Sequence, residues 1–254
     1  MDRVIYTAMN GAARLDEHQA VLTNNMANVN TPGFREQFAM YRSVPLTTGT
    51  GMTTRVATVA STPGHNFQAG VMQTTGRALD VAISGEGWFA IEAPGGGEAY
   101  TRAGNFQVGI DNVLRSAGGQ AVLSEQNAPI AIPENARVTI GTDGTLTAIG
   151  AGDQPNAIVN LGRLKLVVPD ETQLVHGDDG YFRLPPGDEG QPAAALPGNP
   201  ALRVISGMLE GSNANPMTAM VGMIENSRRY EAQMQVLKNV DTNEQRANGI
   251  LSAS

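Results

Sequence analysis

The first thirty residues carry apolar side chains at the spacing of a single helix face. Successive members lie three or four residues apart, and they are Ile5, Ala8, Ala12, Leu15, Gln19, Leu22, Met26 and Val29. This alternation is typical of the seam along which two helices pair, and Gln19 is its one polar member. We therefore predict a helix over about residues 2–28. It should end at Asn30-Thr31-Pro32-Gly33, because proline lacks an N–H and glycine permits the chain to reverse.

A similar spacing recurs near the other end of the chain, and it turns polar before Leu251. Its members are Met220, Met223, Ser227, Tyr230, Met234 and Leu237. Pro216 suits the first turn of such a helix, with Asn215 or Asn213 as its cap. Because these seams occur at both ends and not between them, we predict that the two terminal helices pair with each other as a coiled coil.

Between the two helices the chain has the pattern of a β protein, with alternating apolar residues and frequent glycine turns. Turn residues predict three hairpins, which join residues 79–83 to 88–91, 102–108 to 113–115, and 137–140 to 145–148. A further strand is expected over 161–168. Residues 184–200, rich in proline, glycine and alanine, are expected to lack regular structure.

These elements predict an α+β protein in which a central antiparallel β-rich domain is carried on an extended linker. Residues 1–35 and 205–254 together should form a helical axial domain. Residues 36–78 should form the linker, with edge strands allowed, and residues 79–204 the β-rich domain.

The distribution of charge distinguishes the ends from the middle. The chain has 254 residues and a formal net charge of −7. Residues 1–45 carry four basic and four acidic side chains, and residues 203–254 carry five of each, so the whole excess lies between them. Neutral ends can pack against many similar ends without repulsion, whereas the acidic middle suits a solvated surface.

Composition also narrows the possible functions. With no cysteine, the chain has no disulfide, cysteine–zinc site, iron–sulfur cluster or thiol nucleophile. The acidic balance argues against general binding to nucleic acid, and no apolar run reaches the length that membrane insertion requires. We also see no signal peptide of the secretory type, so the simple expectation is a cytoplasmic protein unless export follows another route.

The search for catalytic chemistry finds little. His18, His65 and His176 lie in three different regions, without a metal-ligand neighbour at helical spacing. Asp178-Asp179-Gly180 could bind a cation but is more simply an acidic turn. Phosphate-binding and nucleophile-elbow motifs are missing, and a glycosidase-like carboxylate pair stays open without support for any one pair. We expect no cofactor, no metal and no enzymatic activity.

Asparagines gather at the end of the first predicted helix, at positions 24, 25, 28 and 30. Asparagine is a poor helix former, so four within seven residues are costly in an isolated helix. We expect their amides to bond to neighbouring backbone and side chains in a crowded polar contact. An isolated helix of this length is also marginal in water, so we expect the ends to be largely disordered before assembly.

Separate segments of the chain resemble the axial proteins of the bacterial flagellar rod and hook. They are NNMANVNTPGF at residues 24–34, LDVAISGEGWFAI at 79–91, YTRAGNF at 100–106, GMLEGSNANP at 207–216 and MIENSRRY at 223–230. The family more often has leucine where Met26 stands, which is a change of similar volume. The length, the opening residues 5–9 and residues 38–45 are most similar to the proximal rod subgroup.

The resemblance implies a structural function. Proteins of this family are exported by the flagellar type III apparatus without a cleaved signal peptide, and they assemble in the periplasm as a helical tube around the export channel. Their terminal helices form the inner layer and their β-rich domain lies outside. The expected partners are copies of the chain, other rod proteins and, during export, the type III apparatus, and the tube would transmit torque from the motor to the hook.

From the seams and the resemblance together we expect an assembly interface. On the first helix it comprises Ile5, Ala8, Ala12, Leu15, Leu22, Asn24, Asn25, Met26, Asn28 and Val29. The turn that follows is Thr31, Pro32, Gly33 and Phe34, and the second helix adds Met220, Met223, Ile224, Tyr230, Met234, Leu237 and Leu251. The alternatives are a distal rod or hook-type subunit and, in another class, a soluble β-domain that binds glycans.

Overall fold

The computed structural model describes residues 2–45, 56–61, 64–150, 157–186 and 193–252. Contacts divide the chain into two compact units. The helical unit comprises Met1–Val29, Arg35–Asn66 and Ala214–Ser254, and the β unit comprises Asn30–Phe34 and Phe67–Asn213. Each unit therefore contains chain segments that are distant in sequence.

The first helix, α1, spans Asp2–Ala27. Its last backbone bond runs from the amide of Asn28 to the carbonyl of Asn24, at 3.0 Å. The chain then turns at Asn30–Gly33, where Gly33 has a φ of 70° that a side chain would disfavour. The predicted helix and its stop signal are both confirmed.

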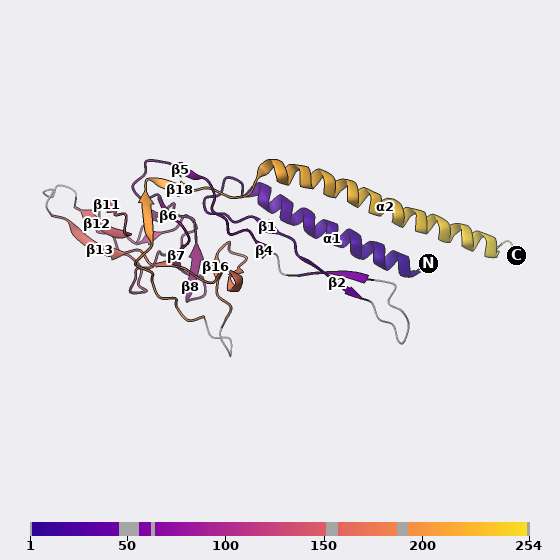
Figure 1. The fold of residues 1–254 in the computed structure, drawn as a ribbon, viewed down its shortest axis with the longest axis horizontal. Coiled ribbons are helices and arrows are strands. Elements are labelled where there is room, and N and C mark those ends of the chain that lie inside the picture. Colours follow the sequence, from indigo (N-terminus) through magenta and orange to yellow (C-terminus); the bar gives the residue numbers. More distant parts are fainter. Residues whose placement is uncertain (1, 46–55, 62–63, 151–156, 187–192, 253–254) are drawn as a thin grey trace. The chain divides into compact units, whose positions relative to one another are not determined.

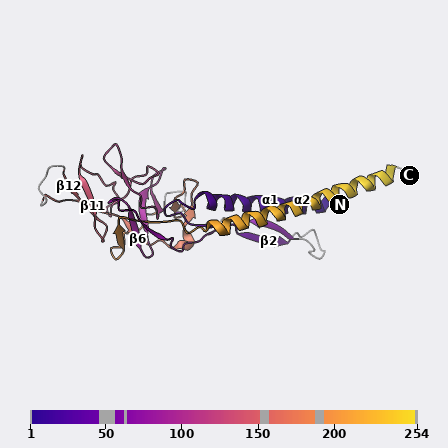
Figure 2. The ribbon, with the colours of Figure 1, turned by 90° about the horizontal axis from the view of Figure 1, so that it is seen from above.

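The second helix, α2, spans Pro216–Ser252. The side-chain oxygen of Asn215 accepts hydrogen bonds from the amides of Met217, at 2.9 Å, and Thr218, at 3.3 Å. These bonds satisfy two of the amides that a helix N-terminus leaves unpaired, so Asn215 rather than Asn213 is the cap. Figures 1 and 2 both show α1 and α2 side by side, with the C-terminal end of α2 extending past the start of α1.

Two short antiparallel pairs of strands complete the helical unit. The strand β1 (Gln37–Phe38) pairs with β4 (Gly64–His65), and β2 (Tyr41–Pro45) pairs with β3 (Val56–Ala60). The hydroxyl of Tyr41 donates a hydrogen bond to the carbonyl of Arg14 on α1, at 2.9 Å.

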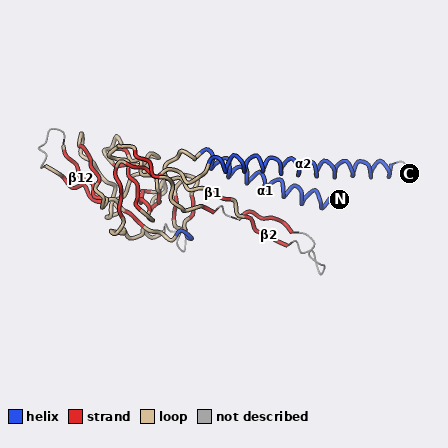
Figure 3. The backbone as a smooth tube through the Cα atoms, turned by 45° about the horizontal axis from the view of Figure 1, so that its top comes forward, coloured by secondary structure: helices blue, strands red, loops and turns tan. Residues whose placement is uncertain are grey.

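The β unit consists of short strands, which Figure 3 draws in red, and of the tight turns that join them. A five-stranded sheet has the order β14-β7-β8-β16-β15, a three-stranded sheet has the order β11-β12-β13, and the pairs are β17-β6, β18-β5 and β10-β9. A 3-10 turn, η1, spans Glu171–Gln173. The strands are β5 (Met72–Thr74), β6 (Val81–Ser84), β7 (Trp88–Glu92), β8 (Glu98–Thr101), β9 (Gln107–Val108), β10 (Leu114–Arg115), β11 (Arg137–Ile140), β12 (Thr145–Ile149), β13 (Val159–Arg163), β14 (Leu166–Val167), β15 (Val175–His176), β16 (Phe182–Arg183), β17 (Arg203–Ser206) and β18 (Met208–Glu210).

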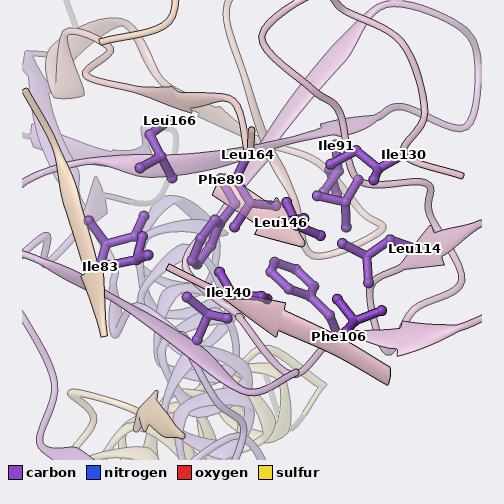
Figure 4. Packing of buried hydrophobic residues seen from close by; sticks show 14 of the residues in the cluster. Ile83, Phe89, Ile91, Phe106, Leu114, Ile130, Ile140, Leu146, Leu164 and Leu166 are labelled. Atoms are coloured by element: carbon purple, nitrogen blue, oxygen red, sulfur yellow. The ribbon is translucent and has the colours of Figure 1, made fainter. Parts of the chain in front are cut away.

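The core of the β unit lies on both faces of β7. Phe89 and Ile91 point into a large aliphatic and aromatic cluster, part of which Figure 4 shows. Trp88 and Ala90 alternate to the other face, where Trp88 and Phe182 pack edge to face with ring centroids 4.9 Å apart. Because successive side chains of a strand point in opposite directions, the continuous apolar run of β7 fills two clusters at once.

The three predicted hairpins have different outcomes. The hairpins about residues 110–112 and 142–144 are confirmed as β9–β10 and β11–β12. The hairpin about residues 84–87 is wrong, because β6 pairs with β17 while β7 pairs with β8 and β14. The turn itself exists, with Gly85 and Gly87 at positive φ, but a glycine-rich turn does not specify that its two flanking strands pair.

Other expectations are met in part. The single strand predicted over 161–168 is two strands, β13 and β14, which belong to different sheets. In the described parts of the 184–200 loop, the structure has neither helix nor strand. The α+β class is confirmed, whereas the coiled-coil pairing, the linker and the domain boundaries stay predictions. The stretch 36–78 contains β1 to β5, and its residues 36–66 belong to the helical unit.

Candidate assembly surface

The face that α2 turns toward α1 begins with small residues. Ala219 is 5% exposed. A side chain added at Gly222 would come within 3.1 Å of Leu22 on α1. Small residues at these positions let the two helices approach closely, at the expense of the apolar area that larger side chains would bury.

Farther along this face the contacts are polar. Asn226, which is 4% exposed, donates from its side-chain amide to the carbonyl of Leu15 at 2.8 Å and to Gln19 Oε1 at 2.9 Å. Its oxygen lies 3.2 Å from Nδ1 of His18. Two turns later, Gln233 donates to the carbonyl of Ala8 at 3.0 Å. Amide side chains that reach backbone carbonyls fix the position of one helix along the other.

The two predicted seams therefore differ in whether they lie at the contact between α1 and α2. Contacts with α2 occur at Ala8, Leu15, Gln19 and Leu22, which belong to the predicted seam of α1. On α2 these contacts come from Gly222, Asn226 and Gln233, each one position before a predicted residue. One residue rotates a helix face by about 100°. The prediction followed the large apolar residues, whereas small residues and amides make the close contact.

Large apolar residues of α2 lie instead on its opposite side. They are Met217, Met220, Val221 and Ile224, with exposed fractions of 67%, 42%, 55% and 56%, and we call them the outer stripe. At about 100° per residue they fall within one arc that is centred away from Gly222 and Asn226. Tyr230 and Met234 are also exposed, and Met223 and Leu237 are half-buried.

The predicted positions on α1 are mostly covered. Ala8 and Asn25 are buried, Asn24 is exposed, and the seven other positions are half-buried, namely Ile5, Ala12, Leu15, Leu22, Met26, Asn28 and Val29. Tyr6 and Met9 point outward, with exposed fractions of 67% and 55%. The side chain of Leu251 lies outside the described residues.

The asparagine cluster makes the kind of polar contact that its composition predicted. The side chain of Asn25 forms the two hydrogen bonds that a neighbouring strand would form. Its Nδ2 donates to the backbone carbonyl of Gln37 at 2.7 Å, and its Oδ1 accepts from the backbone amide of Gln37 at 2.9 Å. Asn28 donates to the carbonyl of Asn24 at 3.0 Å. The end of α1 is thereby joined to the start of β1.

A hollow of about 270 Å³ opens beside α1 in the helical unit. Ala20, Val21 and Met40 contribute apolar walls, and Glu17 is its one acidic lining residue. Within the described residues, no group of three or more acidic, histidine or cysteine side chains could hold a metal ion, and no helix is long and apolar enough to cross a membrane. The surface suits contact with another chain better than chemistry on a small molecule.

Comparison with known proteins gives the chain its family. Models described as flagella basal body rod protein, flagellar hook protein FlgE/F/G D1 domain and flagellar basal body rod FlgEFG protein C-terminal match residues 5–35, 82–148 and 205–250. The flagellar basal-body rod proteins FlgF of Salmonella typhimurium and Escherichia coli are each 45% identical over 254 residues, covering all of both chains. The chain belongs to the flagellar basal-body rod protein family.

Within this family the chain is FlgF-like. The rod protein FlgG of Bacillus subtilis is 28% identical over 256 residues, covering 95% of this chain and 96% of its own. The lower value supports the proximal rod resemblance seen in the sequence. Flagellar rod proteins are structural, so the chain is a structural protein and not an enzyme.

Sequence reasoning overlooked the polar residues of the helix contact. Asn226 and Gln233 lie between apolar positions and were not included in the predicted seam. A usable signal was the small pair Ala219 and Gly222, followed four residues after the glycine by a single asparagine. Small residues at three- to four-residue spacing indicate close helix approach more directly than methionines do.

Proposed function

We propose that this chain is a subunit of the flagellar basal-body rod that packs with copies of itself and with other rod proteins into a helical tube. The tube acts as the drive shaft between motor and hook and surrounds the export channel. The subunit reaches its periplasmic position through the flagellar type III apparatus. Identity with FlgF proteins over the full chain supports the rod, and the outer stripe supports the mode of assembly.

The outer stripe carries the assembly proposal. Burying a methionine or isoleucine side chain fully is worth about 1.5–3 kcal/mol, and four such residues on one helix face leave a large part of that free energy unused in the single chain. An apolar strip of this kind marks a contact surface. Neighbouring subunits that cover the stripe recover this energy.

Charge and symmetry favour repeated packing of the helical ends. Residues 203–254 carry five basic and five acidic side chains, so many copies can gather around one axis without net repulsion. When the outer stripe of one copy packs on a different surface of the next copy, the contact is head to tail and extends into a helix rather than closing as a dimer.

The proposal also accounts for torque transmission. A long helix pair that touches neighbours on several sides distributes load over many contacts. The predicted interface positions on α1, together with the turn Thr31, Pro32, Gly33 and Phe34, contribute to the same inner layer. No single bond then limits the strength of the shaft.

The test introduces charge into the outer stripe. In a strain that lacks the natural protein, Met220→Asp combined with Ile224→Asp should abolish swimming, because both side chains become buried only on assembly. The purified variant should unfold at the same denaturant concentration as the natural chain, since both positions are exposed in the monomer. A swimming strain with normal basal bodies would contradict the proposal.

A matched control uses the same two positions. Met220→Leu combined with Ile224→Leu keeps the volume and apolar character and should leave swimming intact. Because the chain has no cysteine, Met220→Cys also gives a unique cross-linking site. Cross-linked bands should contain a second copy or another rod protein.

A further inference from the structure

Four of the five segments that carry the family resemblance meet at one place inside the β unit. Gly33 comes from NTPGF, Gly85 from SGEG, Arg102 from YTRAGNF and Glu210 from GMLEGSNANP. Three hydrogen bonds and one ion pair connect these residues with one another and with Gly70. Helix assembly does not explain them, because Asn30–Phe34 and Phe67–Asn213 form a unit of their own.

Glu210 is the centre of this group. It is 1% exposed, and its side chain accepts a hydrogen bond from the amide of Gly70 at 2.9 Å. Its second carboxylate oxygen lies 3.3 Å from Nη1 of Arg102. Its backbone carbonyl accepts from the amide of Gly33 at 2.8 Å. One buried residue thus joins three chain segments that are far apart in sequence.

Arg102 holds the group to the core. Its Nη2 donates to the carbonyl of Gly85 at 2.9 Å, and its guanidinium lies 5.8 Å from the ring centre of Trp88. A buried ion pair of this kind is costly to break from one side, because the remaining charge stays buried. The pair is therefore expected to stay closed as long as the β unit is folded.

The segment Asn30–Phe34 lies on this group like a strap. A side chain at Gly33 would come within 2.3 Å of the Ala103 backbone nitrogen, so only glycine fits so closely. The carbonyl of Phe34 accepts from the amide of Asn213 at 3.4 Å, and the side chain of Asn213 donates to Gln68 at 2.8 Å. The strap is thereby tied at both Gly33 and Phe34.

The position of the strap in the chain suggests its function, because it lies between two segments of the helical unit. Residues 30–34 belong to the β unit, yet the residues before and after them belong to the helical unit. The chain also passes between the units at residues 66–67 and 213–214. Next to these points, Asn213 is hydrogen-bonded both to Gln68 and to Phe34 of the strap. We call the strap, Arg102 and Glu210 the clasp.

We propose that the clasp stays closed in the unassembled chain, so that the backbone three residues after the end of α1 is already fixed within the β unit while the two helices still open readily. This proposal rests on the assembly proposed above. Starting a helix is unfavourable because several residues must be fixed for one hydrogen bond, whereas extension from a fixed end is easier. A subunit with a closed clasp therefore folds its helices onto the growing rod from a defined point.

The helix contact supports the second half of this proposal. The residues through which α2 meets α1 include small side chains and amides, and the outer stripe is uncovered. Such a pair opens at low free energy compared with a core. In the clasp, by contrast, the two charged residues Arg102 and Glu210 are buried within the β unit.

The test is amide hydrogen exchange of the purified full-length chain, followed by NMR. The amide of Gly33 should exchange at least about tenfold more slowly than that of Leu15 in α1, a factor equal to about 1.4 kcal/mol. Its rate should approach that of Ala90 in β7. If Gly33 exchanges as fast as Leu15, or if Leu15 is as slow as Ala90, the proposal is wrong.

A pair of glycine substitutions isolates the clasp. Gly33 and Gly76 have φ values of 70° and 74°, but a side chain at Gly76 would meet nothing within 4 Å. Gly33→Ala should lose at least about tenfold in protection at position 33 and at Gly70 while Ala90 stays protected. Gly76→Ala should leave all three unchanged. Loss at Ala90 as well, equal loss from Gly76→Ala, or no loss at position 33 would overturn the clasp.

This experiment is independent of the test for assembly. Exchange is measured on the single chain, whereas the outer stripe is tested by swimming and cross-linking. A chain that assembles but shows a rapidly exchanging Gly33 disproves the clasp alone. A protected Gly33 in a chain whose stripe variants still swim disproves the mode of assembly alone.

Discussion

The β unit and the helix pair solve the problem of burying apolar side chains in opposite ways. In the β unit, Phe89, Ile91 and Leu146 are inaccessible to solvent, and their cluster continues through several sheets. In the helix pair, the outer stripe of α2 faces solvent and the contact with α1 includes small residues and amides. The β unit is stabilised from within, whereas under the proposed assembly the helices gain burial from neighbouring chains.

In the proposed assembly, this contrast allows helices that are loosely paired in the single chain to become part of a stiff tube. A helix pair with little internal burial can open and close at low free energy. The same exposed side chains become a continuous contact once many copies gather. Rigidity is then a property of the assembly, while the β unit keeps its fold before and after.

The largest expected effect breaks the β unit and spares the helices. Phe89 is fully buried and packs edge to face on Phe106, with ring centroids 5.1 Å apart. Phe89→Ala should lower the free energy of unfolding by about 3–5 kcal/mol, because it leaves a cavity in the core. Denaturant unfolding of the purified chain, followed by Trp88 fluorescence, measures the change.

An exposed residue of α2 gives the control for this substitution. Met220→Ala removes apolar atoms that are already in water, so it should change the same free energy by less than about 0.5 kcal/mol. A loss from Met220→Ala comparable to that from Phe89→Ala would mean that the stripe is covered in the single chain. The contrast between the two units would then fail.

A middle-sized effect is expected at the polar helix contact. Asn226→Ala removes two amide bonds and leaves the carbonyl of Leu15 without that partner, at a cost of about 1–3 kcal/mol. The loss should appear as faster amide exchange in α1, with the Trp88 unfolding transition unchanged. Asn243→Ala, at an exposed position of the same helix, should have no such effect. Equal effects of the two would show that Asn226 does not hold the helices together.

Local signals made much of this fold predictable from the sequence. The end of α1 at Asn30–Gly33, the cap Asn215 and the tight turn at Gly144 each depend on a few adjacent residues with strong backbone preferences. The pairing of β6 with β17 depends on segments about 120 residues apart, for which the sequence carries no local signal. Turns were therefore foreseen more reliably than strand partners.

The candidate surface was foreseen only in part, for a related reason. Apolar periodicity identifies a helix face that avoids water, but it does not say whether the cover is the same chain or another. On α1 the predicted seam includes the residues that meet α2, whereas on α2 several of the predicted residues are exposed. The buried pair of Arg102 and Glu210 could not be found at all, because 108 positions separate two residues whose types suggest a solvated surface.

The smallest expected effect compares one surface ion pair from each unit. In the β unit, Arg183 holds Asp179 through two charge-assisted hydrogen bonds, and this lowers the pKa of the Asp179 carboxyl below its usual range. On α2, Arg229 and Glu225 lie 3.7 Å apart and are both more than 60% exposed. Paired side chains in solvent contribute little, so Glu225→Gln should not change stability measurably.

Asp179→Asn should lower the free energy of unfolding of the β unit at pH 7 by up to about 1 kcal/mol, a figure limited by solvent screening. A carboxyl whose pKa is lowered in the folded state stabilises that state above its unfolded pKa of about 3.9, and the contribution is lost as the pH falls through the folded value. The difference between Asp179→Asn and the natural chain should therefore shrink between about pH 4 and pH 2. Denaturant unfolding at both ends of that range measures it, and a difference that stays constant would show that the charge of Asp179 contributes nothing. If Glu225→Gln instead proved as costly as Asp179→Asn at pH 7, the helix pair would have stabilising electrostatics of its own, and its dependence on neighbours would be smaller than the exposed stripe implies.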